Sequence, residues 1–146
     1  MNWEKLEQKH FHKTPIEHFY SSNLFDSTLY DKLYENQNNL DHLVWQEFDA
    51  KYKTGFQFYD DISQVDKNKE IICLWFFKER SDLTNGDAIE LQDKVIKYMP
   101  NTFLITKSKD IKIISKKDKY IRRPFVQIDF KIKVWEELIQ RFNKRP

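Results

Sequence analysis

Cysteine and glycine are scarce in this chain of 146 residues, and their scarcity excludes several classes of protein. The single cysteine, Cys73, rules out a disulfide framework and a zinc site built from several cysteines. It lies within an apolar run, which predicts a small buried side chain rather than a reactive thiol. With 2 glycines and 4 prolines, the chain has too few of either for a glycine-rich phosphate-binding loop or a flexible linker.

Long apolar runs are also lacking, and this bears on where the protein works. No stretch is long enough to span a bilayer, and the first residues have no apolar core of the kind found in secretion signals. The net charge of +2 gives no general electrostatic reason to bind nucleic acid. We therefore expect a cytoplasmic protein whose main partner is neither a membrane nor a nucleic acid.

The residues that are present indicate one soluble domain, because 146 residues suit a single core and 40% of them are hydrophobic. The spacing of apolar residues predicts three helices. Residues 25–33 repeat an apolar residue at every fourth position, and Asp26 or Ser27 can cap this helix by accepting from free amides of its first turn. A second helix is expected at 40–48, and a closing helix at 134–142.

Residues 70–77, which read EIICLWFF, form the clearest strand of the sequence. Nearly every position is apolar, which predicts a strand covered on both faces. Because successive residues of a strand point to opposite faces, we expect two buried faces, one with Ile72, Leu74 and Phe76 and the other with Ile71, Cys73, Trp75 and Phe77. Short strands are expected at 15–22, 56–59, 88–91, 95–98, 102–106 and 111–114, and a last long strand is expected at 120–132.

The order of these elements predicts the fold class. Two early helices are followed by many short strands, and helices do not alternate with the strands, which argues against a parallel sheet. A charged loop at 78–87 contains Asn85-Gly86, a strong signal for a hairpin. We expect an α+β fold that is mostly β, with a sandwich or small barrel covered by helices on one side.

Five stretches in this order resemble the 2-oxoglutarate and Fe(II) dioxygenases of the prolyl 4-hydroxylase-like group. The stretches are PIEHFYSSNLFDSTLYDKLY, YKTGFQFYDDI, CLWFFKERSDLTNGDAIEL, PNTFLITKS and YIRRPFVQIDF. The resemblance implies a double-stranded β-helix, or jelly roll, with N-terminal helices and a C-terminal helix. It divides the single domain 1–146 into an N-terminal extension (1–14), a first strand and helices (15–50), a jelly-roll core (51–132) and a C-terminal helix (133–146).

The chain departs from this family at the residues that bind iron. The family holds Fe(II) with two histidines and one carboxylate. Tyr59 stands where the first histidine would fall, Asp61 matches the carboxylate, and 110–112 contain no second histidine. One carboxylate cannot hold Fe(II) alone, so we expect no metal, no cofactor and no catalytic residue; Fe(II) and 2-oxoglutarate belong to the alternative in which the protein is a divergent oxygenase.

Arg122 and Arg123 are the two candidates to match the family's arginine, which holds the far carboxylate of 2-oxoglutarate. On a strand they would point to opposite faces, so only one can face the barrel. An inward guanidinium needs a partner, because burying an unpaired charge is costly. We expect this partner to be Asp61, which gives a candidate pocket formed by Tyr59, Asp61, Arg122 and Arg123.

Two other groups of residues have the spacing of metal ligands. His10 and His12 would share one face of a strand, but no third ligand stands nearby. Asp60 and Asp61 could join Asp110 or Asp82 around a hard cation, although adjacent acidic residues are more often loop charges. We do not expect either group to bind metal.

The function that we expect is therefore binding rather than catalysis. The Lys- and Asn-rich, Gly-poor composition resembles that of small proteins of tailed phages. The leading hypothesis is a non-catalytic, dioxygenase-like jelly-roll protein that binds a protein partner, either within a phage particle, which would place it in the virion, or on a host component. The alternatives are a divergent 2-oxoglutarate-dependent oxygenase and a weak nucleic-acid-binding module that uses the basic run 107–123.

Overall fold

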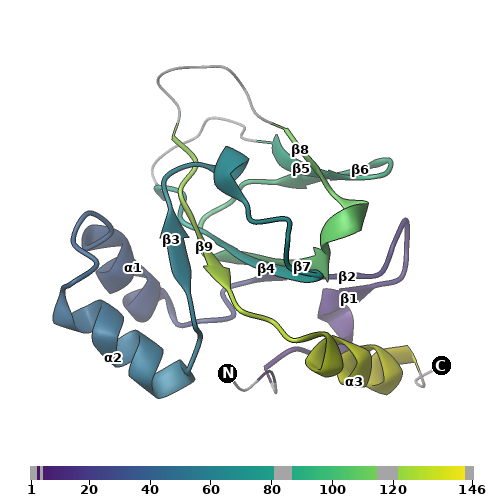
Figure 1. Cartoon of the computed structure of the whole chain (residues 1–146), viewed down its shortest axis with the longest axis horizontal. Coiled ribbons are helices and arrows are strands. Elements are labelled where there is room, and N and C mark those ends of the chain that lie inside the picture. The colour runs from purple at the N-terminus through teal and green to yellow at the C-terminus, as the bar shows by residue number, and fades with distance from the viewer. Residues whose placement is uncertain (1–2, 4, 81–86, 115–121, 144–146) are drawn as a thin grey trace.

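A computed structural model describes residues 3, 5–80, 87–114 and 122–143. Within them the protein is a mixed α+β fold with two antiparallel sheets and three α-helices (Figure 1). The coarse expectation of a mostly β fold with early helices and a closing helix is confirmed. None of the described helices is both long and apolar enough to cross a membrane.

The helices begin close to the positions that the sequence predicts. Their bounds are Ser27–Glu35 for α1, Leu43–Tyr52 for α2 and Ile132–Asn143 for α3. The Asp26 carboxylate accepts a hydrogen bond from the amide of Thr28 at 3.4 Å, so its predicted role as the cap of α1 is confirmed. The prediction that α2 starts at residue 40 was wrong, because turns that end at His42 delay the helix and leave Leu40 exposed.

The larger sheet has six strands in the order β1-β2-β7-β4-β9-β3. Their bounds are Phe11–His12 (β1), His18–Ser22 (β2), Gln57–Tyr59 (β3), Ile71–Phe76 (β4), Thr102–Lys107 (β7) and Phe125–Ile128 (β9). The strand β4 lies inside the sheet between β7 and β9, and every one of its residues is buried. This agrees with the prediction of a strand covered on both faces.

The smaller sheet has three strands in the order β6-β5-β8. Their bounds are Asp87–Leu91 (β5), Lys94–Lys97 (β6) and Lys112–Ile113 (β8). The predicted turn at Asn85-Gly86 lies outside the described residues. The prediction that the strands before and after this turn form a hairpin was wrong. These strands are β4 and β5, which belong to different sheets, and β5 pairs with β6 and β8.

The last strand is shorter than the predicted 120–132. It begins at Phe125, directly after Pro124, which has no amide hydrogen to give to a ladder. It ends at Ile128, and α3 starts at Ile132. Residues 120–121 are outside the described part of the chain.

The core consists of two clusters, one on each face of β4. The predicted division of its side chains is confirmed: Ile72, Leu74 and Phe76 lie in the cluster between the two sheets. The opposite face packs against side chains of all three helices and contributes Ile71, Cys73, Trp75 and Phe77. The six-stranded sheet is thus the middle layer, with helices on one side and the smaller sheet on the other (Figure 1).

Candidate functional site

Tyr59, the first of the predicted pocket residues, ends β3 and pairs with Phe125 of β9. The two rings are stacked, with their centroids 5.1 Å apart and their planes at 19°. Aromatic pairs at such distances are attractive beyond the area that they bury. Tyr59 is therefore fixed as a packing residue at the end of the strand where the dioxygenase resemblance expects a histidine.

Asp61 is held by the backbone around it. One carboxylate oxygen accepts from the amide of Ser63 at 3.1 Å and from its hydroxyl at 2.8 Å. The other accepts from the backbone amide of Arg123 at 3.2 Å. In return, the Gln64 side-chain oxygen accepts from the amides of Asp60 and Asp61. This reciprocal arrangement joins the end of β3 to the segment that leads into β9.

The structure separates the two arginines in the way that the alternation predicts. The Arg122 side chain is 57% exposed and its guanidinium donates to Asp60 at 2.7 Å, whereas Arg123 is only 2% exposed. Tyr98 lies close by, and its hydroxyl donates to the carbonyl of Pro124 at 2.6 Å. Burial raises the pKa of Tyr98, and the charge of Arg123 acts against that rise. The inward arginine is thus Arg123, beside a buried phenol.

Replacing Asp61 with alanine is expected to destabilise the protein by about 1–2 kcal/mol, because it removes a cap and leaves amides without an acceptor. The matched control is Asp60→Ala, which removes only an exposed ion pair of a kind worth about 0–1 kcal/mol. Urea denaturation of both variants measures the difference. Equal losses in the two variants would contradict a structural role specific to Asp61.

The predicted pocket residues do not suit an iron centre of the dioxygenase type. Tyr59 stacks on an aromatic ring, the Asp61 oxygens accept from a hydroxyl and backbone amides, and residues 110–112 contain no histidine. Among all the residues that the structure describes, no three His, Cys, Asp or Glu side chains form a group that could hold a metal ion. Asp82, one proposed partner of the carboxylate pair, is outside those residues.

The two N-terminal histidines do not share a strand face. His10 belongs to a short 3-10 helix, Gln8–His10, and its Nδ1 accepts from the amide of Glu7 at 3.0 Å. His12 lies in β1 and stacks on His18 of β2, with ring centroids 4.9 Å apart. The premise of a shared strand face was therefore wrong, because the strand begins only at Phe11.

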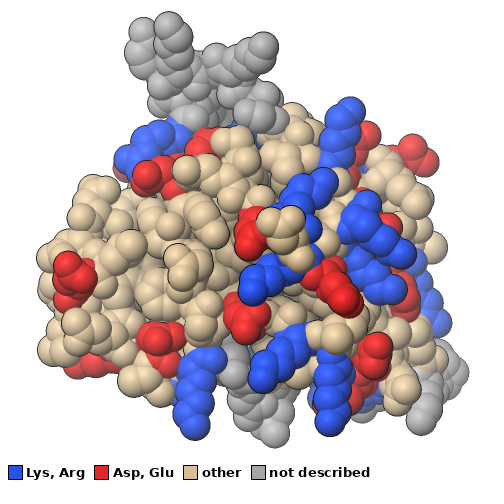
Figure 2. All heavy atoms as spheres, viewed as in Figure 1, with Lys and Arg blue, Asp and Glu red and all other residues tan. Residues whose placement is uncertain are grey.

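Charge on the surface gives no single-sign patch in the view of Figure 2. Lysine and arginine side chains are interspersed with aspartate and glutamate across that face. Arg122, at the end of the predicted basic run, is already paired with Asp60. That face therefore offers no continuous basic surface for phosphates, and residues 115–121 of the basic run 107–123 lie outside the described part of the chain.

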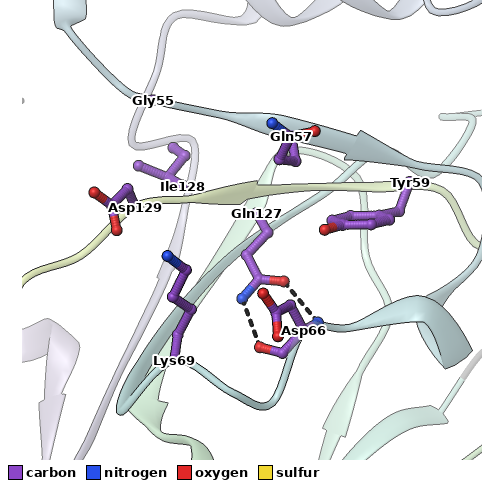
Figure 3. Close-up of a pocket in the computed structure, with 8 residues that line it drawn as sticks. All are labelled: Gly55, Gln57, Tyr59, Asp66, Lys69, Gln127, Ile128 and Asp129. Atoms are coloured by element: carbon purple, nitrogen blue, oxygen red, sulfur yellow. Dashed lines mark hydrogen bonds between the residues drawn. The ribbon is translucent and has the colours of Figure 1, made fainter.

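A hollow of about 210 Å³ lies at the free end of the six-stranded sheet, and sequence reasoning did not find it (Figure 3). Its lining comes from β3 and β9, from residues next to these strands and from the loop before β4: Gly55, Gln57, Tyr59, Asp66, Lys69, Gln127, Ile128 and Asp129. Of the predicted pocket residues, only Tyr59 belongs to it. The one signal in the sequence was the polar alternation of Gln57 and Tyr59 with apolar neighbours.

Gln127 forms the floor of the hollow. Its side-chain oxygen accepts from the backbone amide of Asp66 at 3.0 Å, and its side-chain nitrogen donates to the Asp66 carbonyl at 3.0 Å (Figure 3). A buried amide with both ends bonded is strongly oriented. Gln127 therefore fixes the loop before β4 against β9 and gives the hollow a defined shape.

Four polar side chains around this floor have no hydrogen-bond or ion-pair partner within the described part of the chain. Gln57, Tyr59, Lys69 and Asp129 make no side-chain hydrogen bond or ion pair there, although all four line the same hollow (Figure 3). They present an amide, a phenol, an ammonium and a carboxylate. Convergent polar groups in a concave site are the usual means of fixing a ligand.

Comparisons with protein-family models, curated proteins and solved structures found no match to this chain. The site must therefore be interpreted from its own geometry.

Proposed function

We propose that this chain is a non-catalytic jelly-roll protein of the dioxygenase type, which acts by binding a protein partner. A jelly roll is a long hairpin of strands rolled into two facing sheets. In such a hairpin the outermost strands pair, as do the next ones inward. The pairs β3 with β9, β4 with β7 and β5 with β6 support this arrangement.

The remaining pair of such a hairpin would join β8 to the segment between β3 and β4. That segment forms a short 3-10 helix, Ile62–Gln64, followed by a loop, so it makes no ladder with β8. The two are still neighbours, because the Lys67 ammonium donates to the carbonyl of Ile111 at 3.2 Å. We interpret the fold as a jelly roll in which one strand of the smaller sheet is replaced by an irregular segment.

The observation that carries the non-catalytic proposal is the filling of the space between the sheets. Leu74, Phe76, Leu104 and Phe125 of the larger sheet pack there with no exposed surface. From the smaller sheet, Ala88, Ile89 and Leu91 pack against them and are also buried. A small cosubstrate needs a concave site open to solvent, and this packed interior supports a binding role on the outside of the molecule instead.

The partner in this proposal is a protein, either another component of a phage particle or a component of the host. The support is the Lys- and Asn-rich, Gly-poor composition together with a small chain of 146 residues. In the first case the protein works in the virion, and in the second in the cytoplasm.

The rival function is a divergent 2-oxoglutarate-dependent oxygenase, and the observation that favours it is the buried Arg123 beside Tyr98. Binding at 100 times the dissociation constant would add about 2.7 kcal/mol of stability, which is roughly 8 °C in melting temperature for a chain of this size. We expect that 2-oxoglutarate and Fe(II) do not raise the melting temperature, that the purified protein does not retain iron at one per chain, and that no succinate is formed.

Two arginine variants make this test decisive. If a shift does occur, Arg123→Ala should abolish it and Arg122→Ala should keep it, because only Arg123 is buried. That pattern, or iron bound at one per chain, would overturn the non-catalytic proposal. A melting temperature that stays constant in the wild-type protein and in Arg122→Ala, with no succinate, supports it.

A further inference from the structure

We propose that the open edge of β3 binds an extended peptide segment of the partner, and that a lysine or arginine side chain of this peptide enters the adjacent hollow. The inference rests on the proposed function, because it names the site and the chemistry of the protein partner. It begins from the place of β3 at the end of the six-stranded sheet, where, among the described strands, only β9 pairs with it.

The direction of the backbone groups along this edge follows from the ladder. In an antiparallel sheet, successive residues turn their amide and carbonyl alternately to one neighbouring strand and to the other. Phe77 donates to the carbonyl of Pro124 at 3.0 Å. Residues 124 and 126 therefore bond toward β4, whereas 125 and 127 bond toward β3.

The partners of those last two residues are Tyr59 and Gln57. Phe58, which lies between them, must turn its amide and carbonyl away from β9. The next outward amide belongs to Asp60, and it already donates to the Gln64 side chain at 2.9 Å. The edge thus offers the amide and carbonyl of Phe58 to a further strand, which is the interaction that strand addition uses.

The hollow lies on the face of β3 that carries the side chains of Gln57 and Tyr59, where it could select among the side chains of a bound peptide. Gln57 and Tyr59 point to the same face, because alternate residues of a strand do, and both line the hollow (Figure 3). A peptide strand added beside Phe58 would place every second side chain on that same face. Such a side chain would lie next to the hollow, while the peptide backbone bonds to the edge.

The charges of the hollow favour a basic side chain. Its lining carries two carboxylates, Asp66 and Asp129, and one ammonium, Lys69, so acid exceeds base. Among the described residues, the Asp66 carboxylate accepts only from the amide of Asn68, at 2.9 Å, and the Asp129 carboxylate has no hydrogen-bond or ion-pair partner. A guanidinium or ammonium could pair with these carboxylates and lie against the exposed part of the Tyr59 ring.

The test uses the full chain and a peptide display library of random sequence. The library is selected on the protein, and the recovered peptides are synthesised and measured by fluorescence anisotropy. We expect them to share a lysine or arginine at a fixed position within a run of β-branched and aromatic residues. N-methylation of the amides that face β3 should weaken binding at least tenfold, because main-chain bonds supply much of the affinity in strand addition.

Matched protein variants locate the site. The double variant Asp66→Asn, Asp129→Asn should weaken peptide binding by roughly tenfold, because it removes a charge-assisted contact. The Asp66→Asn change keeps a side-chain oxygen that can accept from the amide of Asn68. Asp93→Asn removes a carboxylate from the exposed turn between β5 and β6 and should leave binding unchanged. Recovered peptides without a shared basic residue, no recovered peptide at all, or equal binding by both variants would overturn the proposal.

The two proposals fail in different ways. Succinate formed from 2-oxoglutarate would overturn the non-catalytic function while leaving peptide binding at β3 intact. Conversely, a protein with no response to 2-oxoglutarate and no charge-dependent peptide binding would keep the proposed function and lose this site.

Discussion

Replacing Trp75 with alanine is expected to lower the free energy of unfolding by about 3–5 kcal/mol, the range found for large aromatic side chains in cores. Trp75 lies on β4 with no exposed surface. Its ring stacks on Phe103 with centroids 5.2 Å apart and also contacts Phe25 and Phe77 at 4.8 Å each. Urea denaturation followed by far-ultraviolet circular dichroism measures the loss without relying on the removed indole.

Part of this loss comes from a polar contact inside the core. The Trp75 indole donates to the Asn101 side-chain oxygen at 2.9 Å, and Asn101 itself donates to the carbonyl of Phe25 at 3.0 Å. Alanine would leave the Asn101 oxygen buried without its donor, which costs about 1–3 kcal/mol. Trp75→Phe removes the same donor but keeps most of the aromatic ring. Its loss of unfolding free energy should therefore be smaller than that of Trp75→Ala.

Leu43→Ala is the matched control, because Leu43 is 60% exposed. Substitutions at such surface positions usually change stability by no more than about 0.5 kcal/mol. A loss below about 1 kcal/mol in Trp75→Ala would mean that β4 is not the central strand of the core.

The fold was predictable where local patterns are sufficient. The apolar run at 70–77 indicates a strand buried on both faces, and alternation alone assigns its side chains to the correct clusters. The cap of α1 follows from Asp26 and the spacing after it. These features depend on neighbours within a few residues, and that information is present in a short stretch of sequence.

The hollow could not be predicted, because it depends on which distant segments meet. Gln127 reaches Asp66 across 61 positions of the chain, and Lys69 lines the same space as Asp129. The prediction paired Asp61 with the guanidinium of whichever arginine, Arg122 or Arg123, faces inward, and the structure does bring Asp61 to the start of β9, where its carboxylate accepts from the Arg123 backbone amide. Alternation indicates the direction of a side chain, but long-range strand pairing decides its neighbours.

The same reason applies to His18, for which the sequence alone indicates no role. It is completely buried in β2. Its Nδ1 donates to the carbonyl of Ile16 at 2.8 Å, since a carbonyl only accepts, so Nε2 accepts from the Lys94 ammonium at 3.0 Å. His12 stacks on it from the other strand. Nothing in the sequence indicates that Lys94, 76 positions away, would face this ring.

Acidification is therefore expected to destabilise the protein through His18. The pKa of this imidazole is lowered from 6.5 to about 4, mainly by burial and in smaller part by the charge of Lys94, while the Ile16 carbonyl acts in the opposite direction. Above pH 6.5 the ring is neutral in both states. Between pH 6.5 and pH 4 the unfolded chain takes up a proton that the folded chain does not, so stability falls as the pH falls.

The size of this effect by pH 4.5 is roughly 2–3 kcal/mol. His18→Gln keeps an oxygen that can accept from Lys94 and removes the titration, so the loss of stability between pH 7 and pH 4.5 should be smaller in this variant by that amount. Leu43→Ala, which changes an exposed side chain that does not titrate, should retain the wild-type pH dependence. Urea denaturation across this pH range provides the comparison, and identical pH profiles for His18→Gln and the wild type would show that His18 is not kept neutral by its burial.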